Sequence, residues 1–180
     1  VVAVRCDNSD DPNSRWYAGC GIYRDVRMVC TKESYVVYDG VCVTTPRVEE
    51  KSATLHVEAS VSEGPYGNHR VVFGILDSEG RKVAEAEAEH RGLDESEMVL
   101  NDTGYVGRWS SDIEVASPHR WKLDDTYLYT VVVDVYAGDE LLDSYSRKFG
   151  IRTIDWDADE GFFLNGEAVK LLGVCLHHDM

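Results

Sequence analysis

The sequence has few basic residues and no long apolar run. Lys and Arg number 18 against 33 Asp and Glu, which gives a formal net charge of -15 at pH 7. A chain of this charge has little with which to neutralise phosphates, which argues against nucleic acid and anionic membranes as partners. No stretch of about 18 consecutive apolar residues is present, so no transmembrane helix is expected.

Cysteine occurs in an odd number and without a metal-binding spacing. The five residues are Cys6, Cys20, Cys30, Cys42 and Cys175. An odd count without a C-x-x-C pair fits neither a disulfide framework nor a zinc site, so we expect no metal and no cofactor. Most of them stand beside valines in apolar strand sequences, which predicts buried free thiols. Free thiols favour the cytoplasm, and a periplasmic or secreted whole protein stays open.

What the sequence does contain is a series of short apolar strands between turns, from about residue 35 to residue 152. Residues 53–61 alternate between apolar and polar or small side chains, as in a strand with one buried face. Asp77–Gly80 and Ala137–Glu140 are turn sequences. Roughly seven or eight strands with turns every 8–12 residues are typical of an antiparallel β-sandwich.

Residues 82–90 carry conflicting signals. Three alanines alternate there with three glutamates: Ala84, Glu85, Ala86, Glu87, Ala88 and Glu89. Both residue types favour helix, yet a helix in this register would have no coherent apolar face. We therefore predict a strand with its glutamates in water, and we interpret these glutamates as solvated surface, not as a catalytic carboxylate pair.

The most informative stretch is residues 149–180. An acidic connector, residues 155–160, precedes Asn165-Gly166, a dipeptide that predicts a type I′ hairpin because both central residues need positive φ. Residues 171–176 are apolar without alternation, as in a strand buried on both faces. They lead into His177-His178-Asp179.

This order of motifs resembles the glycoside hydrolase family 2 enzymes, which include the β-galactosidases, β-glucuronidases and β-mannosidases. The resemblance rests on FGIRTI at 149–154, GFFLNG at 161–166, LGV at 172–174 and HHD at 177–179. In that family the motif marks the passage from an immunoglobulin-like sandwich into a (β/α)8 barrel. WYAGCGIYRDV at 16–26 is similar to the end of the family's jelly-roll domain.

The resemblance implies three parts. Residues 1–34 would be the last strands of an incomplete jelly-roll sugar-binding domain, and residues 35–152 a complete sandwich. Residues 153–180 would be a linker, a β-hairpin and the first strand of an incomplete catalytic barrel. The expected fold class is therefore all-β, an immunoglobulin-like antiparallel β-sandwich with flanking partial strands. Both ends look cut, and their unpaired strand edges would be a route to self-association.

The expected site residues follow from the same resemblance. In family 2 the first histidine of the HHD motif contacts sugar hydroxyls, which implies substrate binding by His177 and, in the same region, Asp179. Arg24 and Asp25 are expected to form a structural ion pair or an interdomain anchor, together with Trp16. No metal site is expected at His177 and His178, because adjacent strand residues face opposite ways.

The implied function is hydrolysis of a terminal β-glycoside with retention, with a β-galactoside as the leading expectation. Retaining enzymes use two carboxyl groups about 5–5.5 Å apart. In this family both are glutamates on later barrel strands, so the chain itself would be an inactive scaffold without catalytic residues. Two alternatives stay open: a carbohydrate-binding module, with Trp109, Trp121 and Tyr105 as its exposed aromatics, and an immunoglobulin-like interaction domain. Core or interdomain packing is the competing interpretation of the two tryptophans.

Overall fold

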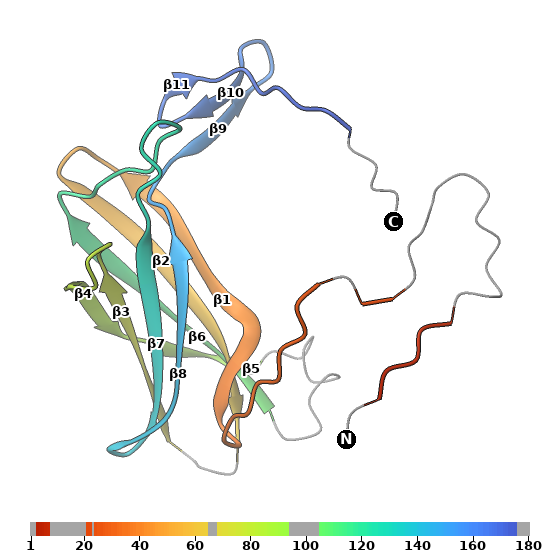
Figure 1. Ribbon diagram of the computed structural model, residues 1–180. Coiled ribbons are helices and arrows are strands. Elements are labelled where there is room, and N and C mark those ends of the chain that lie inside the picture. Colours follow the sequence, from red (N-terminus) through yellow and green to blue (C-terminus); the bar gives the residue numbers. More distant parts are fainter. Residues whose placement is uncertain (1–2, 8–20, 23, 65–67, 94–104, 176–180) are drawn as a thin grey trace. The chain divides into compact units, whose positions relative to one another are not determined.

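A computed structural model describes residues 3–7, 21–22, 24–64, 68–93 and 105–175. The chain divides into a larger unit, residues 31–170, and a smaller unit that combines residues 1–30 with 171–180. In the larger unit the strands form three antiparallel sheets (Figure 1). The predicted all-β sandwich is confirmed.

The sandwich consists of two four-stranded sheets. Sheet A has the order β1-β2-β6-β5: β1 (Tyr35–Val48), β2 (Ser52–Glu63), β6 (Tyr105–Ala116) and β5 (Glu89–Leu93). Sheet B has the order β4-β3-β7-β8: β4 (Lys82–Glu87), β3 (His69–Leu76), β7 (Tyr129–Ala137) and β8 (Glu140–Phe149). A third sheet, which we call the linker sheet, has the order β11-β10-β9: β11 (Glu167–Ala168), β10 (Gly161–Leu164) and β9 (Ile154–Asp157).

The core lies between sheets A and B. The alternation of residues 53–61 is confirmed, because the apolar positions of β2 are at most 2 % exposed: Ala53, Leu55, Val57, Ala59 and Val61. Across from them, Phe73 and Ile75 of β3 and Val133 of β7 are fully buried. Each such side chain contributes roughly 1.5–3 kcal/mol on burial.

Strands β4 and β5 are one extended run that changes sheets at Ala88. Residues before Ala88 pair with β3 of sheet B, and residues after it pair with β6 of sheet A. Ala88 is 7 % exposed, and its N–H donates to the carbonyl of Val71 at 2.8 Å. The strand prediction for residues 82–90 is confirmed, with the glutamates of this run exposed to solvent.

At the edge of the sandwich opposite β4 and β5, polar side chains join β1 to β8. Asp143 accepts the N–H of Val36 at 2.8 Å, and Arg147 donates to the carbonyl of Val41 at 3.0 Å. Arg147 also lies 3.3 Å from Asp39, which has a positive φ of 57° at an irregularity in the β1–β2 pairing. These contacts hold the two edge strands against each other without a backbone ladder.

The prediction of buried thiols is wrong for four of the five cysteines. Cys6, Cys30, Cys42 and Cys175 are free but exposed, and Cys20 lies outside the described residues. Cys42 is exposed because its neighbour Val41 is 2 % exposed and successive strand residues face opposite sides. Cys30 and Cys175 instead follow valines that are exposed themselves, Val29 at 72 % and Val174 at 93 %. Among the described residues, no helix has the length and apolar character needed to cross a membrane.

Candidate functional site

The tip of the linker sheet is a two-residue turn. Leu164 pairs with Glu167, which leaves Asn165 and Gly166 as the turn, with φ of 53° and 80°. The predicted tight hairpin is confirmed, since positive φ at both central residues is what a type I′ turn requires. Asparagine and glycine adopt this left-handed conformation with the least strain.

Asn165 also joins the linker sheet to the sandwich. Its N–H donates to the carbonyl of Thr153 and its Oδ1 accepts the N–H of Thr153, both at 3.0 Å. Its Nδ2 donates to the carbonyl of Trp121 at 2.9 Å. Trp121 belongs to the connection between β6 and β7, so one side chain bridges two segments that are far apart in sequence. We call Asn165, Thr153 and Trp121 the Asn165 latch.

Trp121 is held by contacts with residues 150–152. Its backbone N–H donates to the carbonyl of Ile151 at 2.9 Å. The Arg152 guanidinium lies 4.9 Å from the ring centroid, within the range of a cation–π contact. A Cβ atom on Gly150 would come within 2.9 Å of the Trp121 Cβ, so only glycine fits there. The connection between β6 and β7 is therefore a rigid base for the linker sheet.

A cavity of about 490 Å³ opens beside this base. It is lined by Glu50, Ser117, Pro118, His119, Arg120, Lys122 and Asp125. His119 stacks on the Tyr127 ring with centroids 4.1 Å apart, and its Nε2 lies 2.5 Å from an Asp125 oxygen. The cavity mixes acidic with basic groups, so its charges select no ligand of one sign.

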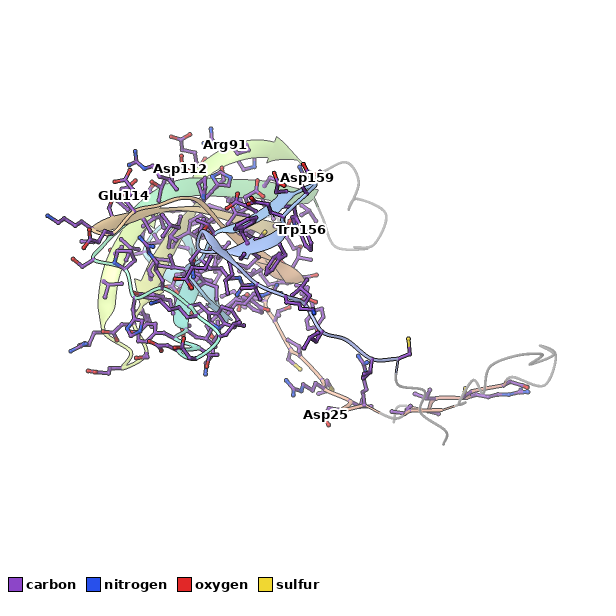
Figure 2. The ribbon with its side chains drawn as sticks, turned by 90° about the horizontal axis from the view of Figure 1, so that it is seen from above. Asp25, Arg91, Asp112, Glu114, Trp156 and Asp159 are labelled. Atoms are coloured by element: carbon purple, nitrogen blue, oxygen red, sulfur yellow. The ribbon has the colours of Figure 1, made fainter. Side chains whose placement is uncertain are left out.

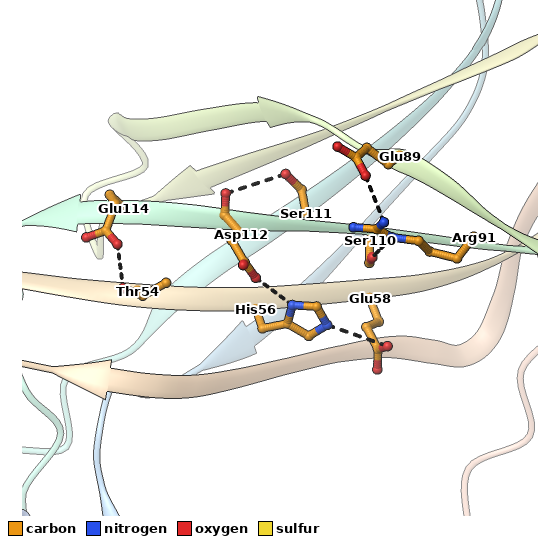
Figure 3. Close-up of polar contacts among 9 residues, drawn as sticks. All are labelled: Thr54, His56, Glu58, Glu89, Arg91, Ser110, Ser111, Asp112 and Glu114. Carbon is orange, nitrogen blue, oxygen red and sulfur yellow. Dashed lines mark hydrogen bonds and ion pairs between the residues drawn. The ribbon is translucent and has the colours of Figure 1, made fainter.

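The outer face of sheet A carries a polar network (Figure 3). The His56 ring contacts Asp112 on the neighbouring strand, with 2.6 Å between Nδ1 and the carboxylate. The hydrogen bond that the ring donates to Asp112 raises the pKa of His56, and the Glu58 carboxylate 3.6 Å away acts in the same direction. Thr54 bonds Glu114 farther along the same face. These are cross-strand pairs of a wet surface.

Ser34 and His69 have the residue types of a nucleophile and its base. The Ser34 hydroxyl lies 2.9 Å from Nε2 of His69, yet Ser34 is fully buried and also accepts the N–H of Gly64. This serine is therefore closed to a substrate. His56 has a carboxylate partner but no serine or cysteine hydrogen-bonded to it in the described part of the chain. Within the same ranges, no group of three or more His, Cys, Asp or Glu could hold a metal ion.

The structure brings together few of the residues predicted to form a site. Trp16, His177, His178 and Asp179 lie outside the described residues. Asp25 lies 3.3 Å from Arg27, with both side chains exposed, and the pairing of Arg24 with Asp25 stays a prediction. Residues 171–175 form no strand and are exposed, so their burial stays a prediction for a whole enzyme.

The tryptophans differ from the set expected of a binding module. Trp109 is 8 % exposed and donates to Glu63 at 3.0 Å, which confirms core packing for this residue. Trp121 is half-buried under Arg152, and the side chain of Tyr105 lies outside the described set. Among the tryptophans that the structure describes, Trp156 of β9 is the exposed one, at 70 %. Sequence reasoning missed it by treating residues 155–160 as an acidic connector instead of a strand and turn; the alternation Ile154, Trp156 was the available signal.

Comparison with known proteins places this architecture among glycosidases. The profile described as Glycosyl hydrolases family 2 matches residues 39–152. The β-galactosidase BoGH2A of Bacteroides ovatus is 40 % identical over all of this chain, which covers 20 % of that protein. A putative β-glucuronidase of Formosa agariphila is 30 % identical over 98 % of the chain, which covers 16 % of it. The chain thus spans about a fifth of the curated relatives it matches.

Solved structures of family 2 glycosidases have the same fold as this chain. A family 2 member from Bacteroides cellulosilyticus superposes with a TM-score of 0.69 at 30 % identity, over 83 % of this chain and 18 % of that one. A β-glucuronidase from Ruminococcus gnavus superposes with a TM-score of 0.59 at 26 % identity, over 78 % of this chain and 20 % of that one. The fold and the matches together define a β-sandwich of glycoside hydrolase type. The chain belongs to the glycosyl hydrolases family 2.

Proposed function

We propose that this chain is the scaffold portion of a retaining family 2 β-glycosidase that acts on terminal β-galactosides. The observation that carries the proposal is the match along the whole chain to a β-galactosidase of which it covers only 20 %. In this proposal residues 35–152 are the immunoglobulin-like domain. Residues 1–34 end a jelly-roll domain, and residues 153–180 lead into the catalytic barrel.

The exposure of the smaller unit supports this division. Met28 is 85 % exposed, Leu172 85 % and Val174 93 %. Apolar side chains this open to water are expected to be covered by further protein. The buried core of the sandwich, by contrast, is formed by residues between Val36 and Ile151. The role that fits this contrast is a rigid spacer that orients a sugar-binding domain against a barrel.

Catalysis in this proposal comes from two carboxyl groups that lie outside the chain. His177 and Asp179 contribute to sugar binding at the mouth of the barrel, where the C-terminal ends of barrel strands meet. Neither residue transfers a proton or attacks the anomeric carbon. Their effect is to hold hydroxyl groups of the sugar while the two carboxyl groups act.

The first test compares the 180-residue chain with the full-length protein that carries it. We expect no turnover of 4-nitrophenyl β-galactoside or β-glucuronide by the chain alone. The full-length protein should hydrolyse the β-galactoside at the higher kcat/KM. A higher kcat/KM for the glucuronide would replace the galactoside in the proposal, and turnover by the chain alone would refute the scaffold role.

The second test uses matched histidine variants of the full-length protein. His177→Ala should lower kcat/KM by about 10- to 100-fold, the loss of one or two hydrogen bonds to a sugar. His178→Ala is the matched control, because in the proposed barrel strand adjacent residues would face opposite sides. Equal losses in the two variants would contradict the assignment of His177.

A further inference from the structure

Two basic side chains in the cavity between β6 and β7 have no acidic partner. Arg120 and Lys122 both line this cavity of about 490 Å³, which we call the Arg120 cavity. In the described part of the chain, neither side chain forms an ion pair. Arg120 is also partly buried, and a guanidinium withdrawn from water favours a carboxylate partner. With 33 acidic residues in the chain, these two cations are nevertheless left available to an anionic group of a ligand.

The two carboxylates of the Arg120 cavity differ in their contacts. Asp125 is engaged, because its carboxylate lies 2.5 Å from Nε2 of His119. Glu50 lines the same cavity and has no basic partner among the residues that the structure describes. A free carboxylate accepts hydrogen bonds from hydroxyl groups. The mixed charges of the cavity therefore match a ligand that carries an anionic group and several hydroxyl donors at once.

The wall of the Arg120 cavity at His119 is aromatic and fixed. The His119 ring stacks on Tyr127 with the two planes 7° apart, and its side chain is 49 % exposed. The backbone N–H of His119 donates to the Tyr129 hydroxyl at 2.9 Å, and the N–H of Ser117 to the carbonyl of Lys51 at 2.8 Å. Aromatic faces suit the C–H surface of a pyranose. A wall that is fixed before binding loses little conformational entropy when a ligand enters.

We propose that the Arg120 cavity binds a hexuronic acid residue of an acidic polysaccharide. The sugar carboxylate lies against Arg120 and Lys122, the hydroxyl groups donate to Glu50, and the pyranose ring lies against His119. Because the chain belongs to the glycosyl hydrolases family 2, a polysaccharide is the natural source of such a residue. Phosphate is disfavoured, because it brings up to two negative charges toward Glu50. This inference goes beyond the proposed function, since it concerns binding by the sandwich and not hydrolysis.

The test is an NMR titration of the 180-residue chain with D-galacturonate. The reporters are the His119 ring and the backbone amide of Lys122, which lie in the cavity. Both signals should shift and saturate in the millimolar range, as expected of a single sugar residue. The amide of Val133, fully buried in the core, should not shift and shows that the sandwich stays folded.

Matched variants assign the binding to the unpaired cations. Arg120→Gln should weaken the binding of D-galacturonate by about 10- to 100-fold, the loss of a charge-assisted hydrogen-bonded pair. Lys122→Gln should weaken it in the same direction. Arg91→Gln is the matched control and should leave binding unchanged, because Arg91 lies on the outer face of sheet A with Asp112 and Glu114 (Figure 2).

Three outcomes of the titration would overturn the proposal. Equal shifts with acetate or inorganic phosphate would identify an anion site that does not recognise a sugar. Equal shifts with galactose would mean that the cations take no part, and no shift with any probe would mean that the cavity binds no uronic acid.

The full-length protein is then titrated with trigalacturonate by calorimetry, as unsubstituted protein and as Arg120→Gln. Weaker binding by the variant is expected, and equal binding would overturn the proposal, because the cavity would then be covered in the whole protein. Hydrolysis of 4-nitrophenyl β-galactoside is measured on the same samples and should be equal in the two proteins. Absence of hydrolysis in both would reject the glycosidase and leave the binding result standing.

Discussion

The Asn165 latch gives the sharpest test of how the linker sheet is held. Asn165→Gly removes both side-chain hydrogen bonds, to Thr153 and Trp121, while it keeps a residue that accepts the φ of 53°. Asn165→Ala removes the same bonds and also places a Cβ atom in left-handed backbone. The two variants therefore separate the hydrogen bonds from the backbone conformation.

The expected magnitudes follow from the contacts. A neutral hydrogen bond contributes about 1 kcal/mol net, so Asn165→Gly should destabilise the docked linker sheet by about 2 kcal/mol. Left-handed backbone adds about 1 kcal/mol for alanine, which brings Asn165→Ala to about 3 kcal/mol. Strands as short as those of the linker sheet, four residues and two residues, are only marginally stable when undocked. The loss should therefore appear as opening of this sheet alone.

Amide hydrogen exchange in the 180-residue chain measures this opening. The reporter is the N–H of Val169, which bonds the carbonyl of Phe162 at 2.9 Å and does not touch Asn165. Its exchange should accelerate about 30-fold in Asn165→Gly and more in Asn165→Ala, while the amide of Val133 in the core stays unchanged. If the Val169 amide exchanged in Asn165→Gly at the same rate as in the unsubstituted chain, the latch would be refuted. Equal exchange in the two variants would refute the backbone contribution.

Three further predictions concern the sandwich and its turns. Gly150→Ala should lower the free energy of unfolding, measured in urea, by about 1–3 kcal/mol, because the new Cβ meets Trp121 at 2.9 Å. Gly74→Ala is the control and should be neutral or stabilising, because the nearest atom to its new Cβ is 4.0 Å away. Equal effects of the two substitutions would contradict this prediction. The Arg81 N–H and guanidinium and the Glu79 N–H hold the pKa of Asp77 below 3.8, so its stabilising contribution is present above that value and is lost as the pH falls through the lowered pKa. Asp77→Asn should thus flatten the acid limb of stability, and an unchanged limb would reject the assignment. The contact with Asp112 raises the pKa of His56 above 6.5 in the fold. The contribution of His56 to stability is therefore present below pH 6.5 and is lost as the pH rises through the raised pKa. An NMR titration of the ring that gives a pKa of 6.5 or lower would show that the Asp112 contact is absent in solution.

The parts of the fold that local pattern determines were predictable from the sequence. Alternation identified the buried face of residues 53–61, and period-two spacing identified residues 82–90 as strand against their helix propensity. The Asn165-Gly166 turn was predictable because its backbone requirement depends on two adjacent residues. Each of these features is decided within a few residues, so the sequence contains all of the information needed.

Features that depend on distant residues were not predictable in this way. The latch joins Asn165 to Trp121, which are 44 residues apart. The exposure of Cys42 depends on which face of β1 points inward, a matter of register against β2. Trp109 packs in the core, where Glu63, 46 residues away, accepts its indole N–H. Trp156 was hidden by its acidic neighbours, since a strand of four residues offers only two apolar positions, Ile154 and Trp156, as a periodic signal.

The change of sheets at Ala88 has a consequence for how the domain acquires its structure. A slip of one residue in strand pairing would turn every side chain of that strand to the opposite face. Because β4 and β5 are one extended run, such a slip in sheet B is transmitted through Ala88 to the pairing of β5 with β6 in sheet A. A misregistered intermediate would then carry errors in both sheets at once, with the glutamates of this run facing the core. A pairing of this run that is wrong in one sheet is thus disfavoured by the other sheet as well.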